Sequence, residues 1–396
     1  MARDVATGAE NNEACALTAL NEWLTLFITP FRKGAFVTIV DPAVQRRFII
    51  TARQSRMPEP DAPSIVYLDT VDDLVVSNLA NVLAVVCRQV TPNHHNEVIC
   101  RTRGIPVIHE PWVDVREGTN GRLAYERAIP DALVLPPKKI QLSAFDPDQV
   151  VPTPTHPEAT FFIRIEHQLL ACTRPAESVD DTLERVKLRV RRFAAALSPG
   201  QKLLVRGLDV RTDDIALAKK FNPGMESNPE LGVHGARHLL QSPDWVAAEA
   251  EVLDGLGSNV EYAVPFVTRH AEFAEFTSRY EPIFSGRKIT AFAETPSIGS
   301  EIEKYEGTHV GLGLKDIAQF FFASDRGAAG GPQKLPLVTA PLPTFIERLV
   351  SDAQTWRVEL AIHQTLESLD VYAPLLNSMA WVPSLTVPDY NLITRA

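Results

Sequence analysis

The chain has 396 residues, 45% of them hydrophobic and 22% charged, which is ordinary for a globular protein and long enough for two domains. Its formal net charge of −10 argues against nucleic acid as a general partner, because phosphate backbones are bound by basic surfaces. The 4 cysteines show no CxxC spacing, and no apolar run approaches the roughly 20 residues of a membrane span. The N-terminus also lacks the basic and apolar parts of a signal peptide, so we expect a cytoplasmic protein that does not engage a membrane.

The predicted elements begin with an amphipathic helix in the N-terminal segment 1–33, where apolar residues of "EACALTALNEWLTLFITPF" recur at helical spacing. Short β-rich runs follow from residue 34 to residue 136 and predict a compact mixed domain. These runs are "AFVTIV", "RFIITA", "SIVYLD", "LAVVCRQV", "IPVIHE" and "ALVLP". The paired prolines Pro136 and Pro137 then predict a hinge, because proline interrupts both helices and sheets.

Residues 137–396 show a regular alternation of apolar strand-like runs and helical stretches. The runs are "KIQLSAF", "ATFFIRI", "KLLVRGL", "VEYAVPFV", "ITAFAET", "HVGLGL", "RVELAIH" and "MAWVPSL". Stretches such as "DTLERVKLRVRRFAAAL" and "LPTFIERLVSDAQ" lie between most of them and have helical periodicity. Strands alternating with helices over about 250 residues predict an α/β fold, a (β/α)8 TIM barrel, and leave a doubly wound sheet as the alternative.

Charged side chains stand at the carboxyl ends of the predicted strands, where barrel enzymes place their chemistry. They are Arg164, Arg206, Glu294, Asp316 and His363, with Arg326 ten residues beyond Asp316. Two carboxylates can hold a hard divalent ion such as Mg2+, and arginines bind the paired oxygens of phosphate and carboxylate groups. Taken singly, each arginine is more typical of a surface salt bridge and each acid of a helix cap. Their coincidence predicts a site for a small, highly anionic, metal-chelating substrate.

The residues around these positions resemble a known enzyme family. "AETPS", "GLGLKDIAQ" and "SDRG" in 289–327 resemble the "ETPA…GTNDLTQ…DRG" stretch of the phosphoenolpyruvate-utilising enzymes. That family includes phosphoenolpyruvate synthase, pyruvate phosphate dikinase and enzyme I of the sugar phosphotransferase system. Upstream, "FIRIEHQLL" is similar to the family's "LFRTEFLF", "VRGLDVRTDD" to "VRTLDIGGDK", "NPELGVHGARHLL" to "NPFLGWRAIR" and "YAVPFVT" to "IMFPMIS". The resemblance implies a TIM barrel of the phosphoenolpyruvate/pyruvate type over 137–396.

The smaller domain carries a second part of the resemblance. "HHNEVICRTRGIPVI" is similar to "TSHTSIMARSLGIPAV" of the family's swivelling β/β/α phosphohistidine domain. His95 falls on the phosphorylated histidine, with Arg101 six residues and Pro106 eleven residues further on. His94 is the alternative acceptor, which the spacing disfavours. The resemblance implies that residues 34–136 form this domain and that His95 is the nucleophile that carries the phosphoryl group.

The resemblance also implies roles for the barrel residues. Arg164, Arg206 and Arg326 would grip phosphate and carboxylate groups, with Arg326 helping to neutralise the migrating phosphoryl group. Glu294 and Asp316 would hold Mg2+ (or Mn2+) against the oxygens of a phosphoenolpyruvate- or pyruvate-like anion. Family likeness further implies a homodimer.

Three positions depart from the family pattern. The first arginine of the "GWR" motif is His234 here, although the second arginine is kept as Arg237. The asparagine of "GTND" is Lys315, which is still a donor suited to phosphate. The cysteine that serves as proton donor and acceptor for the substrate methylene carbon is absent from "RVELAIHQT", where His363 lies at or next to its place. A histidine can act as a general acid or base near neutral pH.

These features predict a Mg2+-dependent phosphotransferase that works through phosphohistidine, in a specialised pathway. About 33 residues precede the histidine domain, too few for the ATP-grasp domain of the synthase and dikinase, so a separately encoded ATP-grasp protein is an expected partner. Two alternatives stay open. One is a metal-dependent lyase or aldolase acting on a 2-oxo acid, with His95 incidental, and the other is a degenerate homologue with a binding role.

Overall fold

The structure is a computed structural model, and it describes most of the chain from Phe36 onward. The described residues are 36–39, 47–58, 61–71, 74, 76–88, 95–109, 118–126, 139–150, 158–174, 177–213, 217, 221–224, 226–324, 337, 340–363, 366–372 and 381–394. The predicted helix in 1–33, the run "ALVLP" and the prolines of the predicted hinge lie outside them. None of the helices in the described part is long and apolar enough to cross a membrane.

The chain divides into two compact units. The first consists of residues 1–88 and 106–127, and the second of residues 89–105 and 128–396. The segment 89–105, which the sequence resemblance assigned to the small domain, is grouped with the barrel in this division. Each unit is therefore described with its own elements below.

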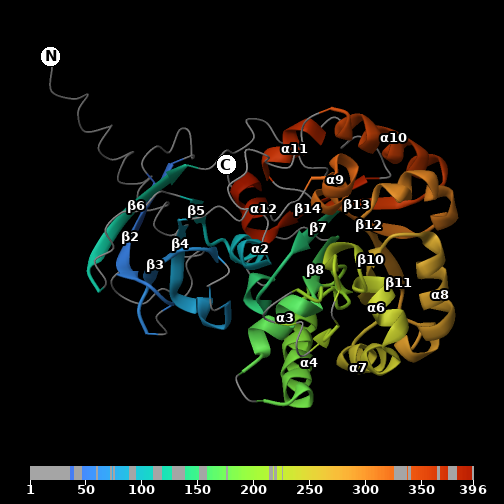
Figure 1. Cartoon of the computed structure of the whole chain (residues 1–396), viewed down its shortest axis with the longest axis horizontal. Coiled ribbons are helices and arrows are strands. Elements are labelled where there is room, and N and C mark those ends of the chain that lie inside the picture. The colour runs from blue at the N-terminus through green and yellow to red at the C-terminus, as the bar shows by residue number, and fades with distance from the viewer. Residues whose placement is uncertain are drawn as a thin grey trace. The chain divides into compact units, whose positions relative to one another are not determined.

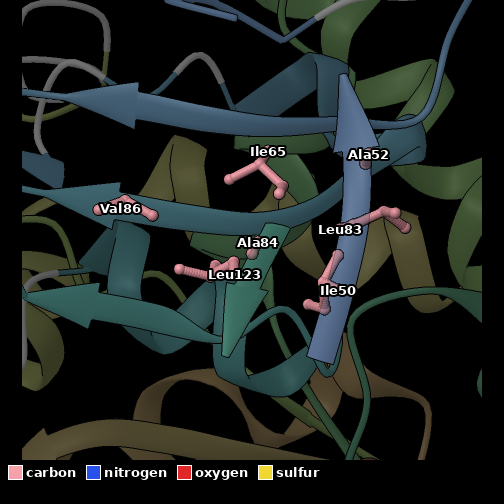
Figure 2. Close-up of a cluster of buried hydrophobic side chains, with 7 residues drawn as sticks. All are labelled: Ile50, Ala52, Ile65, Leu83, Ala84, Val86 and Leu123. Atoms are coloured by element: carbon pink, nitrogen blue, oxygen red, sulfur yellow. The ribbon is translucent and has the colours of Figure 1, made fainter. Parts of the chain in front are cut away.

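The first unit is built on a six-stranded sheet. Its strands are β1 (Phe36–Ile39), β2 (Arg47–Ser55), β3 (Ser64–Leu68), β4 (Val82–Cys87), β5 (Val107–His109) and β6 (Asn120–Glu126), with one 3-10 helix, η2 (Val76–Asn81). Strands β2 to β5 are parallel neighbours, while β1 and β6 both pair antiparallel with β2. Alternating apolar residues of β2 and β3, with others from β4 and β6, bury a small core, which Figure 2 shows.

The second unit is a closed barrel of eight strands. They are β7 (Ile140–Ser143), β8 (Ala159–Arg164), β9 (Lys202–Arg206), β10 (Val260–Val267), β11 (Ile289–Ala293), β12 (His309–Gly313), β13 (Glu359–His363) and β14 (Trp381–Thr386). Every neighbouring pair is parallel, and β14 closes the ring onto β7. All eight strands coincide with the apolar runs found in the sequence, so the barrel prediction is confirmed over the doubly wound alternative.

Helices surround this barrel, as Figure 1 shows. Among the described residues of the second unit, the α-helices are α2 (His95–Thr102), α3 (Ile165–Cys172), α4 (Val179–Ala196), α6 (Gly235–Gln241), α7 (Pro243–Leu253), α8 (His270–Tyr280), α9 (Leu314–Phe322), α10 (Leu342–Thr355), α11 (Leu366–Tyr372) and α12 (Val387–Thr394). Short 3-10 helices occur at η3 (Pro147–Gln149), η4 (Pro229–Leu231), η5 (Glu281–Phe284), η6 (Pro296–Ser300) and η7 (Ile302–Tyr305). Helix α4 illustrates the local logic: Ser178 caps its N-terminus, and Val186, Val190 and Phe193 recur on its buried face.

The barrel strands are continuous apolar runs because both of their faces are covered. Every residue of β10 and of β12 is buried. Inside the ring, Phe162, Leu204, Ala263 and Phe292 form one cluster, contributed by four successive strands. The rings of Phe162 and Phe292 stack with their centroids 5.5 Å apart. This cluster contributes apolar side chains to the barrel core below the carboxyl ends of these strands.

Candidate active site at the carboxyl ends of the barrel strands

A pocket at this end of the barrel brings six of the predicted residues together. They are Arg164, Arg206, Glu294, Lys315, Asp316 and His363. Arg164, Arg206 and His363 are the last residues of β8, β9 and β13, while Glu294 follows β11 and Asp316 lies in the first turn of α9. The parallel arrangement therefore delivers residues from five parts of the sequence to one rim.

The two predicted metal ligands converge over Gly313, the last residue of β12. A Cβ atom added to Gly313 would lie 2.8 Å from Glu294 Oε1 and 2.8 Å from Asp316 Oδ2, so these oxygens are no further apart than twice that distance. Only a glycine leaves room for both carboxylates there. No group of three or more His, Cys, Asp or Glu side chains suited to a metal occurs among the described residues. Mg2+ usually takes one or two protein carboxylates and completes its coordination with substrate oxygens and water, which this pair fits.

Glu294 is held in place by its other carboxylate oxygen. Glu294 Oε2 accepts hydrogen bonds from Arg206 Nη2 at 2.7 Å and from the backbone N–H of Phe266 at 3.1 Å. Phe266 has a φ of 44°, which is unusual for a residue other than glycine and lies at an irregularity in the pairing of β10. The strained backbone thus directs an N–H group to the carboxylate. Burial raises the pKa of Glu294 well above its ordinary value. The positive charge of Arg206 opposes this rise, and the negative charge of Asp316 adds to it.

Arg206 is surrounded by carboxylates. Its Nη1 donates to Glu166 Oε1 at 2.8 Å, and its Nη2 donates to both Asp209 and Glu294. The guanidinium is 3% exposed and lies over the ring of Phe292. Burial alone would lower the pKa of Arg206. The contacts with Glu294, Asp209 and Glu166 outweigh this effect and hold that pKa well above its usual range. Arg206 therefore organises the acids of the site in this structure.

Arg164 has a different environment, although it lies one strand away. Within the described part of the chain its guanidinium has no hydrogen bond or ion pair, and it lies over the ring of Phe162, with Cζ 5.4 Å from the centroid. Burial lowers the pKa of Arg164, and the neighbouring charge of Arg206 lowers it further. An arginine in this situation gains most from an anion, because its charge is desolvated without a counter-charge in contact.

His234 and Arg237, the predicted site residues of the "GVHGAR" segment, are not among the residues that line the pocket. Both ring nitrogens of His234 face acceptors, Asp209 Oδ1 at 2.7 Å from Nδ1 and the carbonyl of Glu230 at 3.1 Å from Nε2. His234 therefore contacts the pocket residue Asp209 without lining the pocket itself. Arg237 donates to the carbonyl of Leu231 at 2.9 Å and does not line the pocket.

His363 lines the pocket and packs against the stacked pair of aromatic rings, Phe162 and Phe292. The ring centroids of Phe162 and Phe292 are 4.4 Å and 4.7 Å from that of His363. His363 Nε2 is 2.7 Å from the side-chain nitrogen of Gln141, and Ser384 Oγ lies 3.1 Å from Nδ1 and 3.3 Å from Nε2. Burial lowers the pKa of His363 well below its ordinary value, and Arg164 and Arg206 act in the same direction. The ring is therefore neutral near pH 7.

Helix α2 also lines this pocket, through Val98, Arg101 and Thr102. His95 is its first residue, one helical turn before Val98. The end of the helix is fixed to the loop after β7, since Gln149 Nε2 donates to the Thr102 carbonyl at 2.6 Å. Arg326 and the alternative acceptor His94 lie outside the described residues.

Two acidic residues of the pocket were missed by the sequence reasoning, Glu166 and Asp209. Each follows a strand-end arginine closely, Glu166 two residues after Arg164 and Asp209 three residues after Arg206. An acid within three residues of a strand end, the position that also marks Asp316 after β12, is the signal that could have found both of them.

Comparisons with known proteins give one partial sequence match. No protein-family model matches the chain. A stretch of 156 residues, 38% of this chain, is 30% identical to phosphoenolpyruvate-protein phosphotransferase from Streptomyces coelicolor. The chain spans only 28% of that relative's length. The match agrees with the motif resemblance over part of the chain.

Solved structures that are similar share little sequence. An HpcH/HpaI aldolase from Desulfitobacterium hafniense is 12% identical, with a TM-score of 0.34 over 65% of this chain and 89% of that chain. Malate synthase from Haloferax volcanii, in a magnesium/glyoxylate complex, is 10% identical, with a TM-score of 0.38 over 60% of this chain and 66% of that chain. Likeness at this level carries no information about chemistry.

Proposed function

We propose that this protein is a divalent-metal-dependent phosphotransferase that binds a phosphoenolpyruvate- or pyruvate-like anion in the barrel pocket and uses His95 as the phosphoryl carrier. The observation that carries the proposal is the pair Glu294 and Asp316, converging over Gly313 in the pocket that Arg164 also lines, where this cation has no ion pair with any described residue. A ligand with several oxygens can bind such a site through a metal and an arginine at once.

The chain's own groups suit the charge of this substrate class. Arg164 would bind the phosphate or carboxylate, with Lys315 at the first turn of α9 as a second cation. Arg206 would orient Glu294 for a metal rather than bind substrate directly. When bound, Mg2+ or Mn2+ would neutralise charge on the phosphoryl and enolate oxygens, where electrostatic catalysis contributes most.

The position of α2 supports the role of His95. Its backbone places His95 one turn before Val98, which lines the pocket, and Arg101 lines the pocket six residues further on. A neutral imidazole nitrogen is a good acceptor of a phosphoryl group, and a nearby arginine can stabilise the added charge. Attack of the imidazole on phosphorus would release the enolate of the 2-oxo acid.

His363 supports a specialised rather than a standard reaction at the methylene carbon. A neutral ring held by Gln141 and Ser384 is a poor proton donor, and no cysteine is present on β13. The ring nitrogen that faces Gln141 would have to exchange that hydrogen bond before it could accept a proton from carbon.

Labelling tests the phosphoryl carrier. Incubation with phosphorus-labelled phosphoenolpyruvate, or with labelled ATP and a cognate ATP-grasp protein, should give an acid-labile, base-stable phosphoprotein. His95→Ala should lose the label, and His94→Ala, the matched control, should keep it. Label that persists in the His95 variant would overturn the relay.

A metal-dependent lyase acting on a 2-oxo acid is the second candidate. The same carboxylate pair and arginine would stabilise the enolate formed when a carbon–carbon bond breaks, without any need for His95. The carbon of that enolate would still have to take up a proton, and because β13 carries no cysteine the proton would come from water. Metal-dependent turnover of a 2-oxo acid that survives His95→Ala would identify this activity.

A further inference from the structure

One buried carboxylate in the pocket lacks the partners that the others have. Glu166, in the first turn of α3, is 2% exposed and lines the pocket. Its Oε1 accepts from Arg206 Nη1 at 2.8 Å. Its Oε2 is buried and has no hydrogen-bond partner among the described residues. A buried acceptor without a donor costs about 1–3 kcal/mol, and more when the group is charged.

The charge balance around Arg206 shows why Glu166 differs from its neighbours. One guanidinium serves three carboxylates, Glu166, Asp209 and Glu294. The second oxygen of Asp209 pairs with His234, and the Arg206-bound oxygen of Glu294 also accepts a backbone N–H group. Glu166 alone of the three meets Arg206 through one oxygen and buries the other unpaired. If one acid of this cluster carries a proton, these contacts select Glu166.

The groups that face Glu166 come from several elements. They are Arg164 at the end of β8, Arg206 at the end of β9, Asp209 in the loop after β9, Glu249 on α7 and Tyr262 on β10. Burial raises the pKa of Glu166, Arg206 and Arg164 oppose the rise, and Asp209 adds to it. The direction of the shift agrees with the contacts.

We propose that Glu166 is a neutral carboxylic acid with its proton on Oε2, and that it donates a hydrogen bond to the oxyanion bound in the pocket. Protonation changes an unsatisfied acceptor into a donor, which an anionic oxygen of the ligand can accept. The inference rests on the proposed function only in that the pocket takes an oxyanion, and it does not require phosphoryl transfer. It makes Glu166 a ligand-binding residue beside Arg164.

A Glu166→Gln variant imitates the proposed state. The amide keeps a carbonyl oxygen for Arg206 and replaces the acid O–H by an N–H donor that cannot ionise. Glu272→Gln is the matched control, since Glu272 is also buried but caps α8 through Thr268 and does not line the pocket. Gln is itself accepted at that capping position, so the control should fold normally.

Infrared spectroscopy of the ligand-free proteins near neutral pH detects directly whether the Glu166 carboxyl group carries a proton. The difference between wild type and Glu166→Gln should contain the C=O band of a neutral carboxylic acid, shifted in D2O. Glu249 contributes equally to both proteins and cancels. The Glu272→Gln difference should show no such band. Absence of the band from the Glu166→Gln difference would overturn the proposal.

Calorimetry with Mg2+ and oxalate tests the hydrogen bond between Glu166 and the ligand through the pH dependence of the oxalate affinity. Wild-type affinity should fall with rising pH, approaching tenfold for each pH unit once Glu166 ionises. Glu166→Gln should lose this pH dependence, and Glu272→Gln should keep it. The same profile in wild type and Glu166→Gln would overturn the ligand contact. If oxalate binds none of the three proteins, the oxyanion site and the ligand contact both fail, while the infrared band still decides where the proton is.

Discussion

At the scale of single residues, Arg164 and Arg206 carry the same charge in adjacent strands but have opposite surroundings. Arg206 is enclosed by three carboxylates, whereas Arg164 contacts an aromatic face and the pocket. Removing a buried cation leaves its acids uncompensated, which typically costs about 3–5 kcal/mol. Removing Arg164, a desolvated cation without an ion pair among the described residues, should change the free energy of unfolding little. It should weaken ligand binding, because the bound anion loses its counter-charge.

We therefore expect Arg206→Gln to lower the free energy of unfolding by about 3–5 kcal/mol. Arg164→Gln should leave that free energy within about 1 kcal/mol of wild type but weaken oxalate binding at least about tenfold. Urea unfolding measures the first quantity and calorimetry the second. Equal losses of stability in the two variants would show that their environments do not differ as described.

Gly313 provides a second test at this scale. A Cβ atom at this position would crowd Glu294 Oε1 and Asp316 Oδ2 without any backbone strain, because the φ of Gly313 is −81°. Gly313→Ala should therefore weaken Mn2+ binding by about tenfold or more, with a change of less than about 1 kcal/mol in stability.

The control for this variant is Gly257→Ala, where the added Cβ would lie 2.7 Å from the side-chain oxygen of Asn259, away from the pocket. It reproduces the crowding of a side-chain oxygen without touching the carboxylate pair. Unchanged Mn2+ affinity in Gly313→Ala would contradict the convergence of the two acids over this glycine.

Which residues share the pocket could be predicted from the sequence, but how they pair could not. Strand-end position marked Arg164, Arg206 and Glu294 because parallel strands deliver their carboxyl ends to one rim. Their pairing depends on side-chain geometry across strands that are far apart in the chain. Nothing in "VRGLD" indicated that Arg206 would be enclosed by acids while Arg164 stays open.

At the scale of elements, Glu249 of α7 joins three parts of the barrel. It accepts hydrogen bonds from the backbone N–H of Leu208 at 2.7 Å, from Trp245 Nε1 at 2.8 Å and from the hydroxyl of Tyr262 on β10. The Leu208 contact fixes the loop between Arg206 and Asp209. Burial raises the pKa of Glu249 to about 7, although these hydrogen bonds oppose the rise.

This raised pKa predicts a pH dependence of stability with a definite sign. The folded protein holds the Glu249 proton more tightly than the unfolded chain, whose glutamates titrate near about 4.3. The associated stability is complete below that value and is lost as the pH rises through about 7. The total loss is roughly 4 kcal/mol, from about 1.4 kcal/mol for each of the roughly 2.7 pKa units between the two states.

Urea unfolding at a series of pH values should therefore show wild type losing stability relative to Glu249→Gln between about pH 4 and about pH 7. Glu251→Gln is the control on the same helix, because Glu251 is exposed and pairs with Lys187. Parallel pH profiles for wild type and Glu249→Gln would contradict the buried, raised-pKa carboxyl.

The elements themselves were predictable to different degrees. All eight barrel strands were found because strands covered on both faces are continuous apolar runs. Strand β6 was missed because it pairs only with β2 at the side of the sheet, and "NGRLAYE" mixes charged and small residues. Its pairing links residues 47–53 with 120–126, a long-range contact that no local pattern indicates.

At the scale of the whole molecule, the proposed function combines a barrel pocket for a metal-chelating anion with His95 at the start of α2. Anion binding is assigned to pocket residues between Arg164 and His363. Phosphoryl transfer is assigned to His95, which belongs to the segment 89–105 that groups with the barrel unit. The phosphohistidine proposal can be wrong while the anion-binding proposal is right, because the labelling experiment tests His95 and the binding experiments test the pocket residues.

The metal site is the central claim, and electron paramagnetic resonance of Mn2+ tests it most directly. Titration of the wild-type protein with Mn2+ should deplete the free-ion signal, and oxalate enriched in oxygen-17 should broaden the signal of bound Mn2+ through direct coordination. Glu294→Gln and Asp316→Asn should each abolish both effects, while Glu272→Gln should retain them. Bound Mn2+ with oxalate broadening in either pocket variant would contradict the account.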